Sequence, residues 1–167
     1  KEREKNLKKL AKLPYKILFI DGYHEDFEAL SAYPDTVYRG AAAKEIAKDK
    51  IYYIKRGEIL QTDDVKILCF GGADDPTDDL FSDNVPNEKD FENCLANLEK
   101  VGGSVDYIIT HSPSGRTVRF LDLNSNATGA TLDFLDILQS KVRYKKWYFG
   151  CGHKDKYISP KMQAVYE

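Results

Sequence analysis

Short apolar runs recur along the chain, and most of them end at glycine, histidine or another polar residue. Runs rich in β-branched and aromatic side chains are typical of strands. We therefore predict buried strands at residues 15–20 and 65–70, and further strands at 105–110 and 146–149. Residues 51–59 are predicted to form paired edge strands around Arg56 and Gly57.

Helical spacing separates these strands. Leu7, Leu10 and Leu13 lie three residues apart among lysines and glutamates, which places them on one face of a helix that ends at Pro14. Because strands and helices alternate, the sequence predicts an α/β layered domain. The predicted helices span residues 2–13, 26–30, 87–101 and 131–139.

Length and composition narrow the class of protein. The 167 residues fit one domain, 1–167, and a net charge of −2 gives no overall field that attracts nucleic acid or an anionic membrane. No apolar run approaches the roughly 20 residues of a membrane span, and no signal peptide is recognised. Cys69, Cys94 and Cys151 form no C-x-x-C pair, so no disulfide framework is indicated and we expect a cytoplasmic location.

The chain has three histidines, His24, His111 and His153, and each follows a predicted strand. Ligands of α/β folds bind at the carboxyl ends of the strands. Imidazole is a common ligand of zinc and iron and a common acid or base. A histidine in such a loop is often only hydrogen-bonded, but three of them in equivalent places indicate a common site.

The segments around the histidines resemble motifs of the calcineurin-like metallophosphoesterases. Residues 18–25, LFIDGYHE, resemble the G-N-H-E motif of that family, and residues 106–111, DYIITH, resemble the strand that ends in its next metal-binding histidine. Residues 147–153, WYFGCGH, resemble its G-H-x-H motif. The motifs follow the family's order over nearly the whole chain. The resemblance implies an α/β fold with two packed sheets flanked by helices.

The resemblance also implies roles for single residues. His24 would assist the phosphate or its leaving group, and His111 and His153 would each bind one of two divalent metal ions, Mn, Fe or Zn. Cys151 stands where the family has a metal-binding histidine, and a thiolate can bind zinc or iron. The implied chemistry is metal-dependent hydrolysis of phosphate esters.

The chain departs from the family at several positions. Tyr23 replaces a metal-binding asparagine, and a neutral phenol is a poor ligand. The family's first two motifs, D-x-H and G-D, do not precede Asp21, so the resemblance implies that the chain begins inside the fold without its first strands. We expect this chain alone to have little or no activity. The alternative is a non-catalytic interaction module that associates with itself or with a partner chain through an exposed sheet edge.

Three other sites are disfavoured. A cysteine phosphatase loop that starts at Cys151 requires arginine at position 157, where the chain has Tyr157. The acidic loop at residues 74–79 lacks the glycine that a calcium loop requires. Ser112 and Ser114 lie beside His111, but neighbours in sequence do not make a catalytic triad.

Overall fold

The computed structural model describes residues 2–74, 83, 85–121, 128–150 and 155–166. Its helices are α1 (Glu2–Leu10), α2 (Phe27–Ala32), α3 (Glu88–Lys100), α4 (Gly115–Phe120) and α5 (Ala130–Lys141). Its strands are β1 (Ile17–Phe19), β2 (Asp35–Tyr38), β3 (Ala41–Ala47), β4 (Ile51–Ile54), β5 (Glu58–Gln61), β6 (Lys66–Phe70), β7 (Tyr107–Thr110), β8 (Lys146–Phe149), β9 (Lys156–Ser159) and β10 (Met162–Ala164).

The first sheet has the strand order β1-β4-β3-β2. β1 runs parallel to β4, and the other neighbours are antiparallel. The prediction of a strand at residues 15–20 is confirmed, but its predicted burial is wrong, because β1 is an edge strand and 39% of Leu18 is exposed. A short apolar run does not distinguish an edge strand from a central one, since both carry the same kinds of side chain.

The predicted pairing within residues 51–59 is wrong. β4 lies inside the first sheet, whereas β5 is the edge of a second sheet with the order β5-β6-β7-β8-β10-β9. The turn between them therefore connects two sheets. Gly57 in this turn has a φ of 78°, and an added Cβ would lie only 2.7 Å from the backbone nitrogen of Cys94 on α3. Only glycine meets both conditions.

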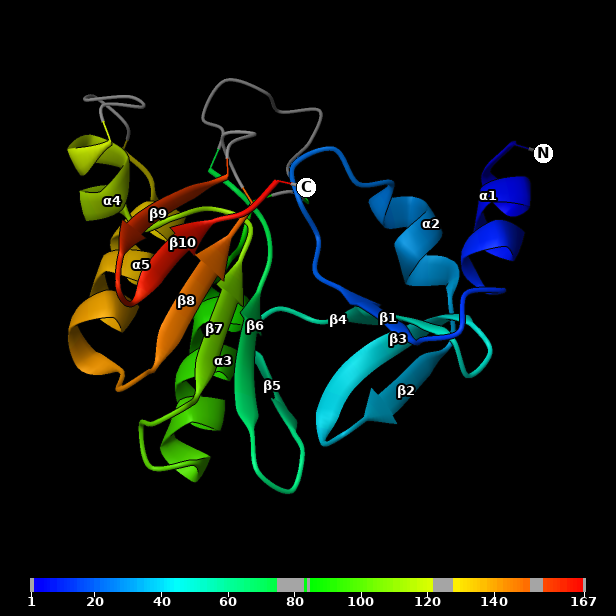
Figure 1. Ribbon diagram of the computed structural model, residues 1–167, viewed down its shortest axis with the longest axis horizontal. Helices are drawn as coiled ribbons and strands as arrows, with labels where there is room; N and C mark the ends of the chain where they lie inside the picture. Colours follow the sequence, from blue (N-terminus) through cyan, green and yellow to red (C-terminus); the bar gives the residue numbers. More distant parts are fainter. Residues whose placement is uncertain (1, 75–82, 84, 122–127, 151–154, 167) are drawn as a thin grey trace.

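Helices α3 and α5 lie against one face of the six-stranded sheet (Figure 1). Leu98 of α3 and Leu135 of α5 join Trp147 and Phe149 of β8 in the main core. Asn87 caps α3 by accepting a hydrogen bond from the backbone N–H of Lys89 at 3.0 Å. The prediction of helices at 87–101 and 131–139 is thus confirmed, apart from small differences at their ends.

The opposite face of the six-stranded sheet is covered only in part. Over β5 and β6, Leu60 and Cys69 pack against Tyr52 of the first sheet, so the two sheets share a second core. Side chains alternate between the faces of a strand, so the same face continues over β7, β8 and β9. There it carries half-exposed or exposed residues, which we call the open face: Tyr107, Ile109, Lys146, Tyr148 and Tyr157.

The described residues form a mixed α/β fold, as the alternation of elements predicted, and its two sheets are flanked by helices. Strands β2 and β3 were not predicted, because the alanines of β3 give no clear apolar alternation. No described helix has the length and apolar character needed to cross a bilayer.

Candidate functional site

The loops that follow β1, β6, β7 and β8 are joined by backbone hydrogen bonds. The N–H of Gly72 donates to the carbonyl of Asp21 at 3.1 Å, and the N–H of His111 donates to the carbonyl of Phe70 at 3.3 Å. The N–H of Gly150 in turn donates to the carbonyl of His111 at 3.1 Å. Segments far apart in sequence therefore form one continuous rim at the carboxyl ends of these strands.

A hollow of about 350 Å³ opens at this rim. The imidazole of the half-buried His111 faces Gly22, where an added Cβ would lie 3.3 Å from His111 Nδ1 and 3.5 Å from Glu25 Oε1. The N–H of Gly22 also donates to Glu25 Oε1 at 3.2 Å. The imidazole of His111 and the carboxylate of Glu25 therefore both lie against the backbone of Gly22.

The other candidate residues of the sequence do not all line this hollow. His24 is exposed, and its ring packs edge-on against Tyr23 with the centroids 4.5 Å apart. Tyr23 lines the hollow together with His111. Cys151 and His153 lie outside the described residues, although Gly150, which precedes them, lines the hollow. Their role as metal ligands stays a prediction.

The two serines beside His111 have structural contacts. Ser112 is buried, and its hydroxyl donates to the carbonyl of Gly72 at 3.2 Å. Ser114 is completely buried as the N-cap of α4, where its oxygen accepts a hydrogen bond from the N–H of Thr117. Each hydroxyl thus completes local backbone hydrogen bonding, as expected for a buried polar group.

A buried ion pair that the sequence analysis did not find lies behind the rim. Asp21 is completely buried, and its Oδ2 accepts hydrogen bonds from Arg56 Nε at 2.8 Å and Nη2 at 2.6 Å. Its Oδ1 accepts a hydrogen bond from the hydroxyl of Tyr53 at 3.0 Å. Burial raises the pKa of Tyr53, and the negative charge of Asp21 raises it further. Burial alone would lower the pKa of Arg56, but Asp21, Tyr53 and Asp90 together outweigh this effect and the pKa is raised.

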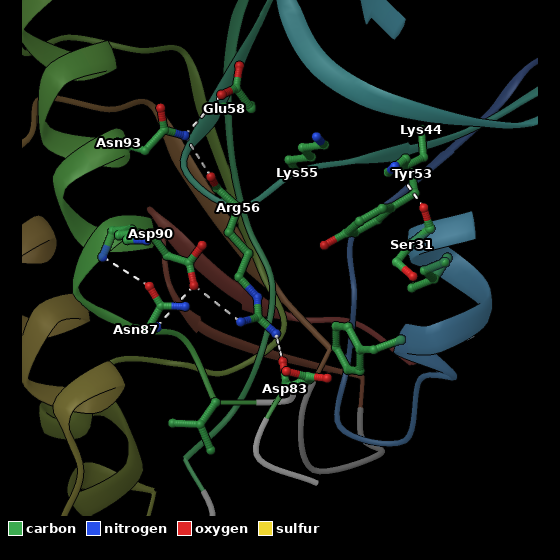
Figure 2. A pocket seen from close by; sticks show the side chains of 14 residues that line it. Ser31, Lys44, Tyr53, Lys55, Arg56, Glu58, Asp83, Asn87, Asp90 and Asn93 are labelled. Atoms are coloured by element: carbon green, nitrogen blue, oxygen red, sulfur yellow. Dashed lines mark hydrogen bonds and ion pairs between the residues drawn. The ribbon is translucent and has the colours of Figure 1, made fainter. Parts of the chain in front are cut away.

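A larger cavity, of about 760 Å³, lies on the other side of this ion pair, between α2, β4 and the start of α3. Arg56 reaches across it, with Nη1 3.3 Å from Asp90 Oδ2 and Nη2 2.7 Å from the carbonyl of Asp83 (Figure 2). Glu58 accepts a hydrogen bond from the amide of Asn93 at 2.9 Å. Arg56, Asp90 and Glu58 are thus engaged by neighbouring groups of this cavity, which is also lined by Lys44, Lys55 and Lys89.

The described residues do not fit two metal ions. A dimetal site requires bridging carboxylates and further ligands around two ions about 3.5–4 Å apart. Both oxygens of Asp21 are engaged by Arg56 and Tyr53, which leaves Glu25 and His111 as donors at the rim. Within the described part of the chain, no group of three His, Cys, Asp or Glu residues is suited to hold a metal.

One sequence signal for the ion pair exists, but it is incomplete. Asp21 directly follows an apolar strand, where an acidic side chain is buried only if it is paired. Nothing in the sequence identifies its partner, because Arg56 lies in a segment that reads as a turn beside Gly57.

The chain matches no family model, no curated protein and no solved structure with which it was compared. The calcineurin-like resemblance therefore rests on the three histidine-bearing motifs and their order.

Proposed function

We propose that this chain is a metallophosphoesterase-like protein whose rim of strand-end loops binds a phosphate ester. The observation that carries the proposal is the hollow of about 350 Å³, which is lined from all three motif segments, by Tyr23, His111 and Gly150 among others. Loops at the carboxyl ends of parallel strands are the usual ligand sites of α/β folds. The resemblance of the same three segments supplies the chemical class.

The three histidines and Cys151 have proposed roles. His24 is exposed beside the rim, where it assists the leaving group, and His111 contributes to a divalent ion together with His153 and Cys151. A bound Mn, Fe or Zn ion would offset the charge of the phosphate and lower the pKa of a bound water. Both oxygens of Asp21 are engaged by Arg56 and Tyr53, so this carboxylate is not available to bridge two metal ions. We therefore expect little or no hydrolysis by this chain.

The test compares metal binding with turnover. Zinc binding is measured by calorimetry, and hydrolysis of bis-p-nitrophenyl phosphate is measured with manganese or zinc. We expect zinc binding that His111→Ala abolishes and that the exposed control Lys141→Ala retains, with turnover near the background rate. Zinc binding and turnover that are both unchanged in His111→Ala would overturn the proposal.

A second function is favoured by the open face and the β1 edge. Leu18 is 39% exposed on that edge, and Tyr157 is 72% exposed on the open face. Unpaired strand edges and exposed apolar faces favour association with another chain. The chain would then be a non-catalytic module that self-associates. Light scattering over a range of concentrations should show a dimer that Leu18→Lys disrupts, and a constant monomer mass would exclude this function.

A further inference from the structure

We propose that Arg56 is a positioning residue of the strand-end site, acting through Asp21 on the loop that carries Glu25. Arg56 would set the geometry of this site, and the proposal rests on the proposed function only for the identity of the ligand. Contacts run from Arg56 to Asp21, and from Gly22, the next residue, to the groups at the rim.

Arg56 holds Asp21 in a single arrangement. Its Nε and Nη2 both bind Asp21 Oδ2, at 2.8 and 2.6 Å, while Tyr53 occupies Oδ1 at 3.0 Å. Lysine carries the same charge but lacks the planar group that can donate two directed hydrogen bonds. The geometry of this contact therefore depends on the guanidinium group and not only on its charge.

The opposite side of Asp21 is closed by the loop after β6. An added Cβ at Gly71 would lie 2.1 Å from Asp21 Oδ1, and the N–H of Gly72 binds the carbonyl of Asp21 at 3.1 Å. Asp21 thus lies between the guanidinium of Arg56 and the backbone of another strand end. The side chain of Asp21 is therefore enclosed on both sides in its present conformation.

Asp21 is joined directly to the site. The next residue, Gly22, donates its N–H to Glu25 Oε1 at 3.2 Å and faces the imidazole of His111. A change in the backbone at Asp21 therefore moves the residue that both rim groups contact. Glu25 and His111 would then change their separation, because both lie against Gly22.

Arg56 is itself fixed by two helices. Asp90 Oδ2 of α3 lies 3.3 Å from Nη1 (Figure 2). The guanidinium carbon lies 5.4 Å from the ring centroid of Phe27 of α2. A buried ion pair is weak evidence for stability as such, because desolvation offsets the attraction between the charges. A positioning role therefore explains the pair better than a gain in stability alone.

The experiment replaces Arg56 and observes the rim without any ligand. Arg56→Lys is compared with Arg119→Lys, a matched control because Arg119 binds Asp136 at 3.0 Å on the surface. In ¹⁵N-labelled protein at one fixed pH, we expect Arg56→Lys to shift the amide signals of Gly22 and Glu25 and the ring signals of His111. In Arg56→Lys, the amide signals of the buried residues of α5 should remain unchanged. In Arg119→Lys, the signals of Gly22, Glu25 and His111 should match those of the wild type.

Zinc binding supplies a second readout. Loss of an outer contact that orients ligands typically weakens metal affinity 10- to 100-fold, so Arg56→Lys should weaken zinc binding by about 10-fold or more. If Arg56→Lys does not fold, Tyr53→Phe replaces it, because this variant removes only the hydroxyl bonded to Asp21. A folded variant whose rim signals match the wild type would overturn the positioning role. A wild type that binds no zinc would instead overturn the proposed function, while the ligand-free spectra still decide the role of Arg56.

Discussion

The two faces of the six-stranded sheet differ in how completely they are covered. Under α3 and α5, Trp147 and Phe149 are at most 1% exposed. On the other face, their neighbour Tyr148 is half-exposed, although it belongs to the same strand. Alternation along one strand thus separates a closed core from a surface that water or another molecule can reach.

The difference between the two faces explains where a ligand can reach the sheet. The hollow at the strand ends lies along the border between the two faces, since it is lined by Tyr148 of the open face and by Phe149 of the covered face. The covered face supplies rigid support, and the border supplies access. Substitutions on the two faces should therefore have very different effects on stability.

The largest effect is expected on the covered face. Trp147→Ala removes a fully buried ring whose N–H donates to Thr110 Oγ1 at 2.8 Å. Such a change leaves a cavity and removes one of the two hydrogen bonds of the Thr110 hydroxyl, and it should cost about 3–5 kcal/mol of unfolding free energy. Urea denaturation measures this loss, and Trp147→Phe, which retains a ring, should lose less. A loss below about 1 kcal/mol would contradict the assignment of this face as the core.

The next effect tests the close packing of Gly71 against Asp21. Gly71→Ala would place its Cβ 2.1 Å from Asp21 Oδ1, and overpacking of this kind typically costs about 1–3 kcal/mol. Gly150→Ala is the matched control at the same rim, because a Cβ added at Gly150 would lie 3.9 Å from the carbonyl oxygen of Val165, an ordinary van der Waals contact. Thermal unfolding should separate the two variants clearly. Equal midpoints would mean that Asp21 has more room than the geometry indicates.

A smaller effect depends on pH. Burial raises the pKa of the Cys94 thiol from about 9 to about 12. The thiol stays protonated in the folded state and ionises more easily when unfolded, so its contribution to stability is complete below about pH 9 and is lost as the pH rises toward 12. We expect a loss of about 1 kcal/mol between pH 8 and pH 10 from this group, measured by urea denaturation.

Thiol chemistry provides the check on that loss. Alkylation of Cys94 by iodoacetamide should be slow in the folded protein at pH 9, because the thiolate is the reactive form. Cys94→Ala should show a shallower fall in stability over the same pH range. Rapid alkylation of the folded protein would contradict the burial of this side chain.

The smallest effect is expected on the open face. Tyr148→Thr should change the unfolding free energy by less than about 1 kcal/mol, because the ring is already half-exposed and threonine suits a strand. The control is the adjacent Phe149→Ala, which should cost about 3–5 kcal/mol. Similar losses from the two variants would show that the open face is covered in solution, which would favour self-association.

The fold could be predicted in its elements and less well in their pairing. The helices at 87–101 and 131–139 and the strand β8 were found because their apolar spacing is local. The separation of β4 and β5 into two sheets was missed, because pairing depends on which distant strand lies alongside. The candidate site shows the same division, since His111 was recognised from its strand, whereas Arg56 was read as part of a turn.

The sequence by itself determined the alternation of strands and helices and the placement of His24 and His111 in loops that follow strands, because these follow from short-range periodicity and turn residues. Only the tertiary structure decided that Asp21 and Arg56 form a buried pair and that Gly22 lies against His111. The physical reason is that a buried charge requires a partner but does not specify which one. That partner is selected by the packing of two sheets, which no local stretch of sequence contains.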